Sequence, residues 1–183
     1  MQEQVARQDF KGKDLSNEAI ADRLYEKCNF AGANLQGAAL DDISFVSCDL
    51  TAANLKGARV GRVRFEGCKL VGVDFHECAG FLDMSFSKCV MESCNFSNLK
   101  MKRTPFKENE IRRCVFVRTD LTEADFAASD LSDRVFQQAD LSRANFVGAY
   151  NYAIDPRANT LTKARFNLPQ AASLLRGLDI IIE

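Results

Sequence analysis

The sequence lacks the features that mark three large classes of protein. Lys plus Arg number 24 against 25 for Asp plus Glu, so the strong basic excess of a general nucleic-acid binder is absent. Residues 1–7 contain no apolar segment of the kind found in signal peptides. No apolar run approaches the length of a membrane-spanning helix. We therefore expect a cytoplasmic protein that does not bind nucleic acid or membranes directly.

The residues and motifs that build catalytic and metal sites are also scarce. His76 is the only histidine, and its place in the repeat described below points outward, away from Cys78. Neither a glycine-rich phosphate loop nor a nucleophile elbow is present. Seven Cys is an odd number, which in a chain without an export signal indicates reduced thiols. We expect no enzyme activity, no metal site and no cofactor.

What the sequence does contain is a period of five residues. From residue 10 to 75 every fifth residue is apolar or aromatic, and after one extra residue near 79–80 the pattern continues from 81 to 146. All 14 Phe occupy this central position of the repeat. The pattern fails at Asn151 and Pro156 and then returns at Leu161 and Phe166. Such regularity indicates a repeat architecture.

Two further positions of the repeat are selective. The residue two places before the central one is small, and all seven Cys occupy this position in one frame or the other. The residue immediately before the central one is often Asp or Asn. A five-residue period matches neither a helix nor a simple strand. It suits a chain that turns a corner every five residues and points two side chains of each five inward.

Four such sides close a square coil of twenty residues, and stacked coils pair in parallel about 4.8 Å apart. The fold class expected is therefore an all-β solenoid, with about seven coils in a rod of roughly 34 Å. Large residues then stack on large residues in columns along the core. The core phenylalanines expected from this spacing are Phe86, Phe96, Phe106, Phe116, Phe126, Phe136 and Phe146.

Both ends of a solenoid expose an edge that must be capped. Polar residues at the inward small positions of residues 1–27 indicate a degenerate N-terminal cap within a repeat domain spanning 1–166. The coil at 150–160 is irregular, the insertion at 79–80 marks a kink or a bulge, and Arg134 occupies an inward slot that requires a partner.

Residues 167–183 form the C-terminal segment, and Pro169 and Gly177 suit the start and end of a short α-helix there. Leu168, Ala171, Ala172 and Leu175 would form an apolar stripe on that helix. We expect the segment both to cap the rod and to join two subunits; the alternative is a cap without dimerisation. The residues expected at the dimer contact are Leu168, Ala171, Leu174, Leu175, Leu178, Ile180, Ile181 and Ile182.

Charge is distributed unevenly along the chain. Residues 100–118 hold seven basic and two acidic residues, whereas residues 119–141 are acidic apart from Arg134. Asp120 and Asp140 lie twenty residues apart and should stack about 4.8 Å from each other, where like charges repel. This pattern favours a partner-binding patch, although Asp is also the habitual residue before the central one. The candidate residues are Asp120, Glu123, Asp125, Asp130, Asp133 and Asp140.

The segments 33–37, 53–57 and 139–143 resemble the A(D/N)LXX consensus of the pentapeptide-repeat family, and the resemblance covers residues 8–166. It implies a right-handed quadrilateral parallel β-helix. Within that family the chain resembles the quinolone-resistance (Qnr) group in its length, its first repeat at Phe10, its irregular coil at 154–156 and its C-terminal segment at 170–178.

Proteins of the Qnr group are dimers joined through the C-terminal helix, and their rod imitates B-DNA in the DNA-binding saddle of DNA gyrase. The resemblance therefore implies a non-enzymatic DNA mimic that binds gyrase or another type II topoisomerase, with fluoroquinolone resistance as a consequence. Qnr proteins also carry projecting loops that bear on drug protection, and here only one residue is inserted. The alternative is a protein-interaction solenoid or regulator whose partner is unrelated to DNA.

Overall fold

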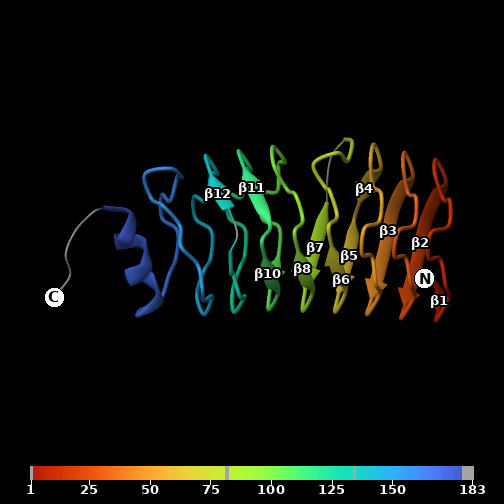
Figure 1. Ribbon diagram of the computed structural model, residues 1–183, viewed down its shortest axis with the longest axis horizontal. Helices are drawn as coiled ribbons and strands as arrows, with labels where there is room; N and C mark the ends of the chain where they lie inside the picture. The colour runs from red at the N-terminus through yellow and green to blue at the C-terminus, as the bar shows by residue number, and fades with distance from the viewer. Residues whose placement is uncertain (1, 81–82, 134, 179–183) are drawn as a thin grey trace.

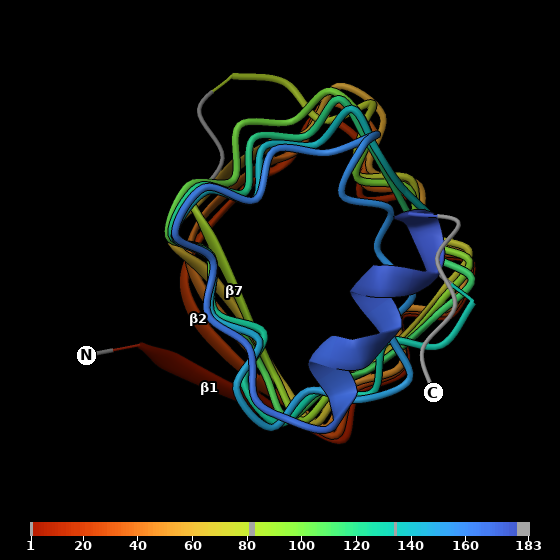
Figure 2. The same cartoon turned by 90° about the vertical axis from the view of Figure 1, so that its left-hand side faces the viewer.

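The computed structural model describes residues 2–80, 83–133 and 135–178. The described chain winds as a coil along one axis, with its first and last described residues at opposite ends of the rod (Figure 1). Viewed along that axis, successive coils superimpose around a four-sided interior (Figure 2). The parallel β-solenoid expected from the five-residue period is confirmed.

Short parallel strands on successive coils form the sides of the rod. One sheet has the order β1-β2-β3-β5-β7-β9 with β4 also paired to β3, a second has the order β10-β8-β6, and the third is β11-β12. The strands are β1 (Glu3–Ala6), β2 (Ala19–Glu26), β3 (Ala39–Val46), β4 (Arg59–Gly61), β5 (Val63–Glu66), β6 (Lys69–Val71), β7 (Met84–Ser87), β8 (Val90–Glu92), β9 (Phe106–Lys107), β10 (Glu110–Arg112), β11 (Val115–Val117) and β12 (Val135–Gln137).

The inserted residue is absorbed at one corner of the coil. Arg59 pairs with Ala79, twenty residues on, whereas Val63 pairs with Met84, twenty-one residues on. The rings of Phe65 and Phe86 nevertheless stack with centroids 5.1 Å apart and planes within 6°. The stacked core therefore continues across this change of register without a kink; residues 81–82, next to the insertion, lie outside the described part of the chain.

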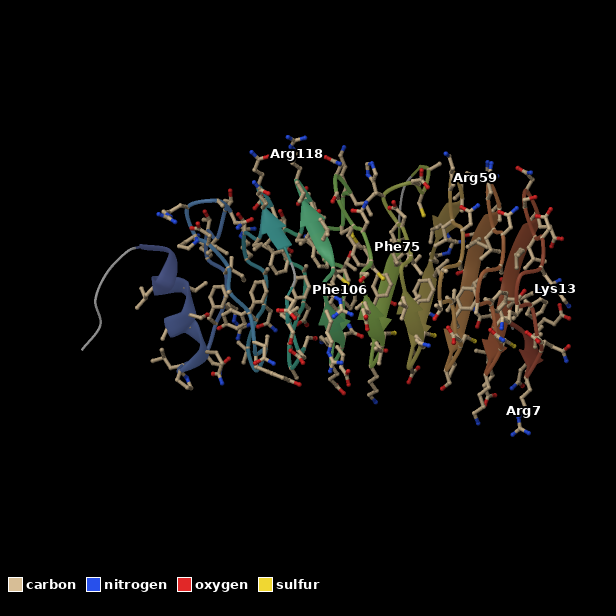
Figure 3. The ribbon with its side chains drawn as sticks, viewed as in Figure 1. Arg7, Lys13, Arg59, Phe75, Phe106 and Arg118 are labelled. Carbon is tan, nitrogen blue, oxygen red and sulfur yellow. The ribbon has the colours of Figure 1, made fainter. Side chains whose placement is uncertain are left out.

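The core contains two aromatic columns that interlock. All seven expected phenylalanines are buried, and neighbouring rings within each column stack face to face, as with Phe86 and Phe106 at 5.1 Å and 6°. Rings of opposite columns meet edge to face, as with Phe86 and Phe96 at 5.8 Å and 83°. Figure 3 shows Phe75 and Phe106 inside the rod and the Arg59 and Arg118 side chains directed outward. The first column contains Tyr25, Phe45, Phe65, Phe86, Phe106, Phe126, Phe146 and Phe166; the second contains Phe75, Phe96, Phe116 and Phe136.

The small inward position also supplies hydrogen-bond donors at the corners. The Cys48 Sγ–H donates to the carbonyl oxygen of Tyr25 at 3.3 Å, and Tyr25 is a central residue of the preceding coil. In later coils of the same column the Asn109 Nδ2–H donates to the Phe86 carbonyl at 3.1 Å. The carbonyl groups left free where the chain turns would otherwise be buried and unpaired. Cysteine suits the small inward position because its side chain is small and its S–H group can donate a hydrogen bond. The sequence pattern indicates the small size but not the hydrogen bond.

The N-terminal coil is less enclosed than the coils that follow. Gln8, Lys13 and Glu18, which occupy inward positions of the repeat, are exposed, and Phe10 is only half-buried. The Lys13 ammonium lies 5.1 Å from the centroid of the Phe10 ring and covers this end of the core.

The irregular coil near the C-terminus keeps the core filled with different residues. No strand occurs between residues 151 and 158, and Tyr152 and Ile154 are buried there in place of Asn151 and Pro156. Pairing resumes where Asp140 bridges to residue 160. Arg134, whose accommodation the sequence leaves open, lies outside the described residues.

The C-terminal helix differs from the expected α-helix. Helix η1 (Gln170–Leu178) is a 3-10 helix, which has three residues per turn. Ala171 and Leu174 are consequently half-buried on one face, and Leu174 packs against the core, while Ala172 and Leu175 are exposed. The stripe of Leu168, Ala171, Ala172 and Leu175 was predicted for 3.6 residues per turn and is therefore wrong. The described part of the chain does not include the side chain of Leu178, nor the residues Ile180, Ile181 and Ile182.

Candidate protein-binding surface

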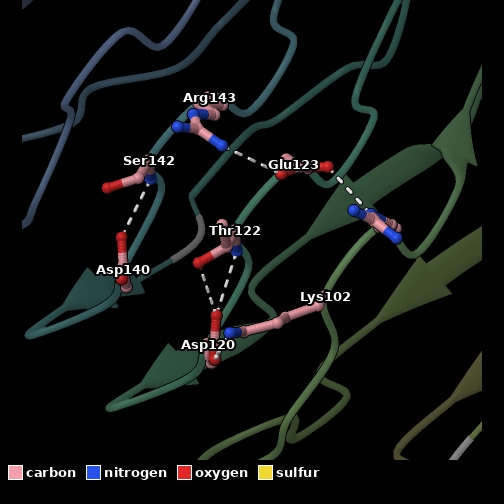
Figure 4. A network of polar contacts seen from close by, with 8 residues as sticks. Lys102, Asp120, Thr122, Glu123, Asp140, Ser142 and Arg143 are labelled. Atoms are coloured by element: carbon pink, nitrogen blue, oxygen red, sulfur yellow. Dashed lines mark hydrogen bonds and ion pairs between the residues drawn. The ribbon is translucent and has the colours of Figure 1, made fainter.

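Three of the six candidate acidic residues lie together on one side of the rod. Asp120 and Asp140 are aligned by a parallel bridge, as the twenty-residue spacing predicts, and Glu123 lies at the end of the same side (Figure 4). Asp125 and Asp130 lie on other sides of the rod, where they form parallel bridges to residues 145 and 150 respectively. The six residues therefore do not form one acidic patch, because each five-residue step along the chain turns a corner.

Two of the three clustered carboxylates, Asp120 and Glu123, are paired with cations from neighbouring coils. The Lys102 Nζ lies 3.6 Å from Asp120 Oδ2. The Arg103 Nε donates to Glu123 Oε2 at 2.8 Å, and the Arg143 Nη1 lies 3.4 Å from the other oxygen of Glu123. Figure 4 shows Glu123 between two guanidinium groups. This side of the rod is a ladder of alternating charge.

The remaining acidic residues have different surroundings. Asp125 accepts hydrogen bonds from Lys107 Nζ at 2.9 Å and from Asn145 Nδ2 at 2.9 Å. Asp130 is 8% exposed and accepts from the Ser132 hydroxyl at 2.6 Å. Asp133 is exposed, and its backbone lies in the left-handed region with φ of 50°. Of the six candidates, Asp133 is thus the most exposed residue.

Hydrogen bonds keep the carboxylates of Glu123, Asp125 and Asp140 ionised at neutral pH. The hydrogen bond from Arg103 lowers the pKa of Glu123 below its ordinary value. The hydrogen bond from Ser142 lowers the pKa of Asp140. Partial burial acts to raise the pKa of Asp125, but hydrogen bonds, first of all from Lys107, lower it overall. The surface therefore carries fixed charges of both signs.

Charge pairing between coils recurs along the rod. Arg62 forms two hydrogen bonds to Asp42, twenty residues earlier, at 2.8 and 2.7 Å. Arg103, Glu123 and Arg143 are spaced by twenty residues, so the solenoid period was the sequence signal for this network. The basic stretch 100–118 and the acidic stretch 119–141 occupy adjacent coils. Their charges therefore pair with each other in the folded rod, although the two stretches are separate in the sequence.

The Asp or Asn before each central residue has a structural role. The Asp120 Oδ1 accepts a hydrogen bond from the Thr122 N–H at 3.2 Å, and Asp140 Oδ1 accepts one from the Ser142 N–H at 2.9 Å. Asparagine makes the same contact, as with Asn54 and the Lys56 N–H at 3.1 Å. The negative charge is therefore not needed for the turn, and its presence at Asp120 and Asp140 is free to serve recognition.

Across residues 2–80, 83–133 and 135–178, no group of three or more His, Cys, Asp and Glu side chains is placed to hold a metal ion. His76 Nδ1 lies 2.8 Å from the Ser97 carbonyl oxygen. Over the same ranges, no helix has the combination of length and hydropathy that crossing a membrane requires.

The C-terminal end exposes several large apolar side chains. Leu168 is 80% exposed, and Val147, Tyr150 and Leu175 are between 37 and 44% exposed. Among the residues expected at the dimer contact, Leu168 and Leu175 therefore face solvent, while Ala171 and Leu174 turn toward the rod.

Comparison with known proteins places the chain by its repeats. A family model described as the pentapeptide repeat region matches residues 19–89 and 89–166. A search of curated proteins gives no match. A trypsin-treated form of QnrB1, described as a plasmid-mediated fluoroquinolone resistance protein, superimposes with a TM-score of 0.89 at 20% identity, covering 99% of this chain and 90% of that one. HetL, a pentapeptide-repeat protein involved in heterocyst differentiation regulation in the cyanobacterium Nostoc, superimposes with a TM-score of 0.63 at 20% identity, covering 88% of this chain and 81% of that one. The chain therefore belongs to the pentapeptide-repeat family.

Proposed function

We propose that this protein is a non-catalytic rod that binds a type II topoisomerase, DNA gyrase in the first place, where the enzyme binds duplex DNA. The observation that carries the proposal is the superposition on QnrB1 over nearly the whole of both chains. The rod offers a regular ladder of charge at the coil spacing of about 4.8 Å, with Asp120 and Asp140 at its centre. By occupying the DNA site, the protein would reduce the amount of enzyme–DNA complex on which a fluoroquinolone acts.

The paired charges define how such binding would work. A basic side chain on the enzyme must compete with Lys102 for Asp120 and with Arg103 and Arg143 for Glu123. Exposed ion pairs of this kind contribute only about 0–1 kcal/mol, so exchanging one for another costs little. The ladder can therefore present carboxylates to a basic saddle although the net charge of the chain is −1.

The test separates the charge of the ladder from its structural role. Asp120→Asn together with Asp140→Asn keeps the oxygen that accepts the backbone N–H and removes two negative charges. We expect this variant to bind purified gyrase at least tenfold more weakly in a titration. The matched control is Asp14→Asn with Asp74→Asn, which removes the same two charges from residues with the same turn role elsewhere on the rod.

The control is expected to bind like the unchanged protein. Equal affinities for the ladder variant and the control would contradict a role for this side of the rod. Thermal unfolding of both variants checks that the coils remain folded.

A second candidate function is docking on a protein partner unrelated to DNA, and the neutralised surface is the observation that favours it. The two functions differ in salt dependence. Binding to a DNA site through charge should weaken steeply between about 50 and about 500 mM salt, because the screening length falls from about 14 Å to about 4 Å over this range. Apolar docking should change little over the same range.

We further propose that two rods join at their C-terminal ends, where Leu168 and Leu175 are exposed. Leu168→Asp should convert a dimer to a monomer in light scattering without lowering the unfolding temperature, because its side chain is 80% exposed in the single chain. Val90→Asp, at an exposed apolar residue on β8, is the control and should leave the dimer intact. A monomeric unchanged protein at micromolar concentration would contradict this assembly.

A further inference from the structure

One corner of the rod carries a charged residue in every coil from residue 22 to residue 163. All eight of these residues are exposed or half-buried. At the other three corners the same position is glycine in several coils, as at Gly12, Gly37 and Gly67. The eight residues, called the charged corner below, are Asp22, Asp42, Arg62, Asp83, Arg103, Glu123, Arg143 and Lys163.

The residues of the charged corner lie in line along the rod. Parallel pairing sets neighbouring coils level with each other about 4.8 Å apart, as where residue 21 pairs with 41 and residue 120 bridges to 140. Val63 pairs with Met84 across the insertion, so Asp83 follows Arg62 in the same line. Successive coils superimpose when viewed along the axis (Figure 2), and the line therefore runs along the rod for about 34 Å.

Ion pairs within the chain involve five of these eight residues. Arg62 contacts Asp42 at 2.7 Å. Glu123 contacts Arg103 at 2.8 Å and Arg143 at 3.4 Å. Each pair joins neighbouring coils, so the alternation of signs in the middle of the line serves the single rod.

The other three residues of the charged corner, Asp22, Asp83 and Lys163, form no ion pair with any residue in the ranges 2–80, 83–133 and 135–178. Like charges also stack at both ends of the line, where they repel: Asp22 lies beside Asp42, and Lys163 lies beside Arg143. Pairing within one rod does not require this order. The single rod therefore has excess negative charge at one end of the line and excess positive charge at the other, and a fitting partner has the opposite order.

A second copy of this chain has the opposite order when it lies antiparallel. From Asp22 to Lys163 the line holds two negative charges, then single positive, negative, positive and negative charges, then two positive charges. Reading the line backwards reverses every sign, so all eight residues face an opposite charge on the second copy. The facing pairs, each formed twice, are Asp22 with Lys163, Asp42 with Arg143, Arg62 with Glu123, and Asp83 with Arg103.

The order of signs favours this one alignment of the two rods. Sliding one rod by one coil in either direction would set like charges opposite each other at five of the seven facing positions. A parallel arrangement in register would make all eight facing charges alike. Because like charges placed opposite each other are unfavourable, both alternatives are disfavoured.

The residues beside the corner fit the same alignment. Arg64 lies two residues after Arg62, and Asp125 lies two residues after Glu123. When Arg62 faces Glu123 of the second copy, Arg64 therefore faces Asp125. Arg64 is exposed and forms no ion pair with any described residue, and Asp125 is half-buried.

We propose that two copies of this protein pair side by side and antiparallel along the charged corner. The two-fold axis passes between the coils of Asp83 and Arg103, and both rods use the same surface, as such symmetry requires. The contact runs along the length of the rod. It is therefore separate from the end contact proposed above for Leu168 and Leu175.

The first measurement is light scattering of the unchanged protein in about 500 mM and then about 20 mM salt. Lower salt lengthens the range of the charges, so the average mass should at least double. Leu168→Asp, which removes the end contact, should show the same response to salt, so failure of one contact is distinguishable from failure of the other. An average mass that does not change with salt would overturn the proposal.

Charge reversal tests the facing pairs. Asp22→Lys and Lys163→Glu each set like charges opposite each other at both ends of the paired rods, and each should weaken association about tenfold at the lower salt. Combining the two substitutions in one chain, or mixing the two single variants in equal amounts, restores opposite charges and should recover the association. Neither residue has an ion pair to lose within the described chain, so circular dichroism should show that both variants fold.

Lys88→Glu is the matched control. Lys88 is exposed at another corner, its φ is 54° against 58° for Lys163, and it forms no ion pair with any described residue. The control changes the net charge as much as Lys163→Glu does and should leave association unchanged. Equal weakening by these two variants would show that net charge alone controls association. No recovery in the double variant or in the mixture would show that Asp22 and Lys163 do not face each other, and either result would overturn the proposal.

Discussion

Phe126→Ala is expected to lower the free energy of unfolding by about 3–5 kcal/mol. Phe126 is fully buried and stacks between Phe106 and Phe146, with ring centroids 4.9 and 5.1 Å away. It also meets Phe116 and Phe136 edge to face at 6.2 and 5.9 Å. The substitution removes four aromatic contacts at once, and the backbone ladders on both sides prevent the coils from closing the cavity. A denaturant titration followed by circular dichroism measures the change.

The same substitution at the end of the rod provides the control. Phe10 is half-buried, stacks on one neighbour only, Phe30 at 4.6 Å, and lies at the open N-terminal coil. Phe10→Ala should therefore cost less than half as much as Phe126→Ala. A cost below about 1 kcal/mol for Phe126→Ala, or equal costs at the two positions, would contradict a core built from continuous columns.

Asn109→Ala is expected to be nearly as damaging, by about 3 kcal/mol, although it removes a polar side chain. Asn109 is 1% exposed. Its Nδ2–H donates to the Phe86 carbonyl at 3.1 Å, and its Oδ1 accepts from the Cys89 N–H at 2.8 Å. Alanine would leave both backbone groups buried without a partner, and each orphaned group costs about 1–3 kcal/mol.

The column itself suggests a rescue. Ser129, one coil later, donates from its hydroxyl to the Phe106 carbonyl at 2.6 Å and accepts from the Asn109 N–H at 3.0 Å. Asn109→Ser should therefore recover at least half of the stability that Asn109→Ala loses, as measured in the same denaturant titration. If serine and alanine were equally destabilising, the loss would come from side-chain volume rather than from the corner hydrogen bonds.

The five-residue period was sufficient to predict the fold because each unit repeats one local geometry. The central apolar residues, the small inward residues and the paired coils follow from that geometry alone. Where the period fails, the prediction fails with it: Tyr152 and Ile154 fill the core of the irregular coil, although the frame points to Asn151 and Pro156. The type of the C-terminal helix was also missed, because an apolar stripe does not distinguish 3.6 from three residues per turn in so short a segment.

The candidate site was harder to predict because charge was read along the chain. In the folded rod the nearest neighbour of a surface residue lies twenty residues away, so Arg103 and Arg143 neutralise Glu123 although neither is close to it in sequence. The cysteines were interpreted by size for a similar reason. The carbonyl that each thiol bonds belongs to the preceding coil, for example Tyr25 for Cys48, and only the folded chain brings the two together.

The most direct test of the proposed function is a DNA gyrase supercoiling assay in which the purified protein is titrated, with and without a fluoroquinolone. A rod that occupies the DNA site should inhibit supercoiling at micromolar concentration or relieve the inhibition by the drug, and the Asp120→Asn, Asp140→Asn variant should do so more weakly than the Asp14→Asn, Asp74→Asn control. No effect on gyrase or on topoisomerase IV, with folded protein, would contradict the account and leave a solenoid whose partner is unrelated to DNA.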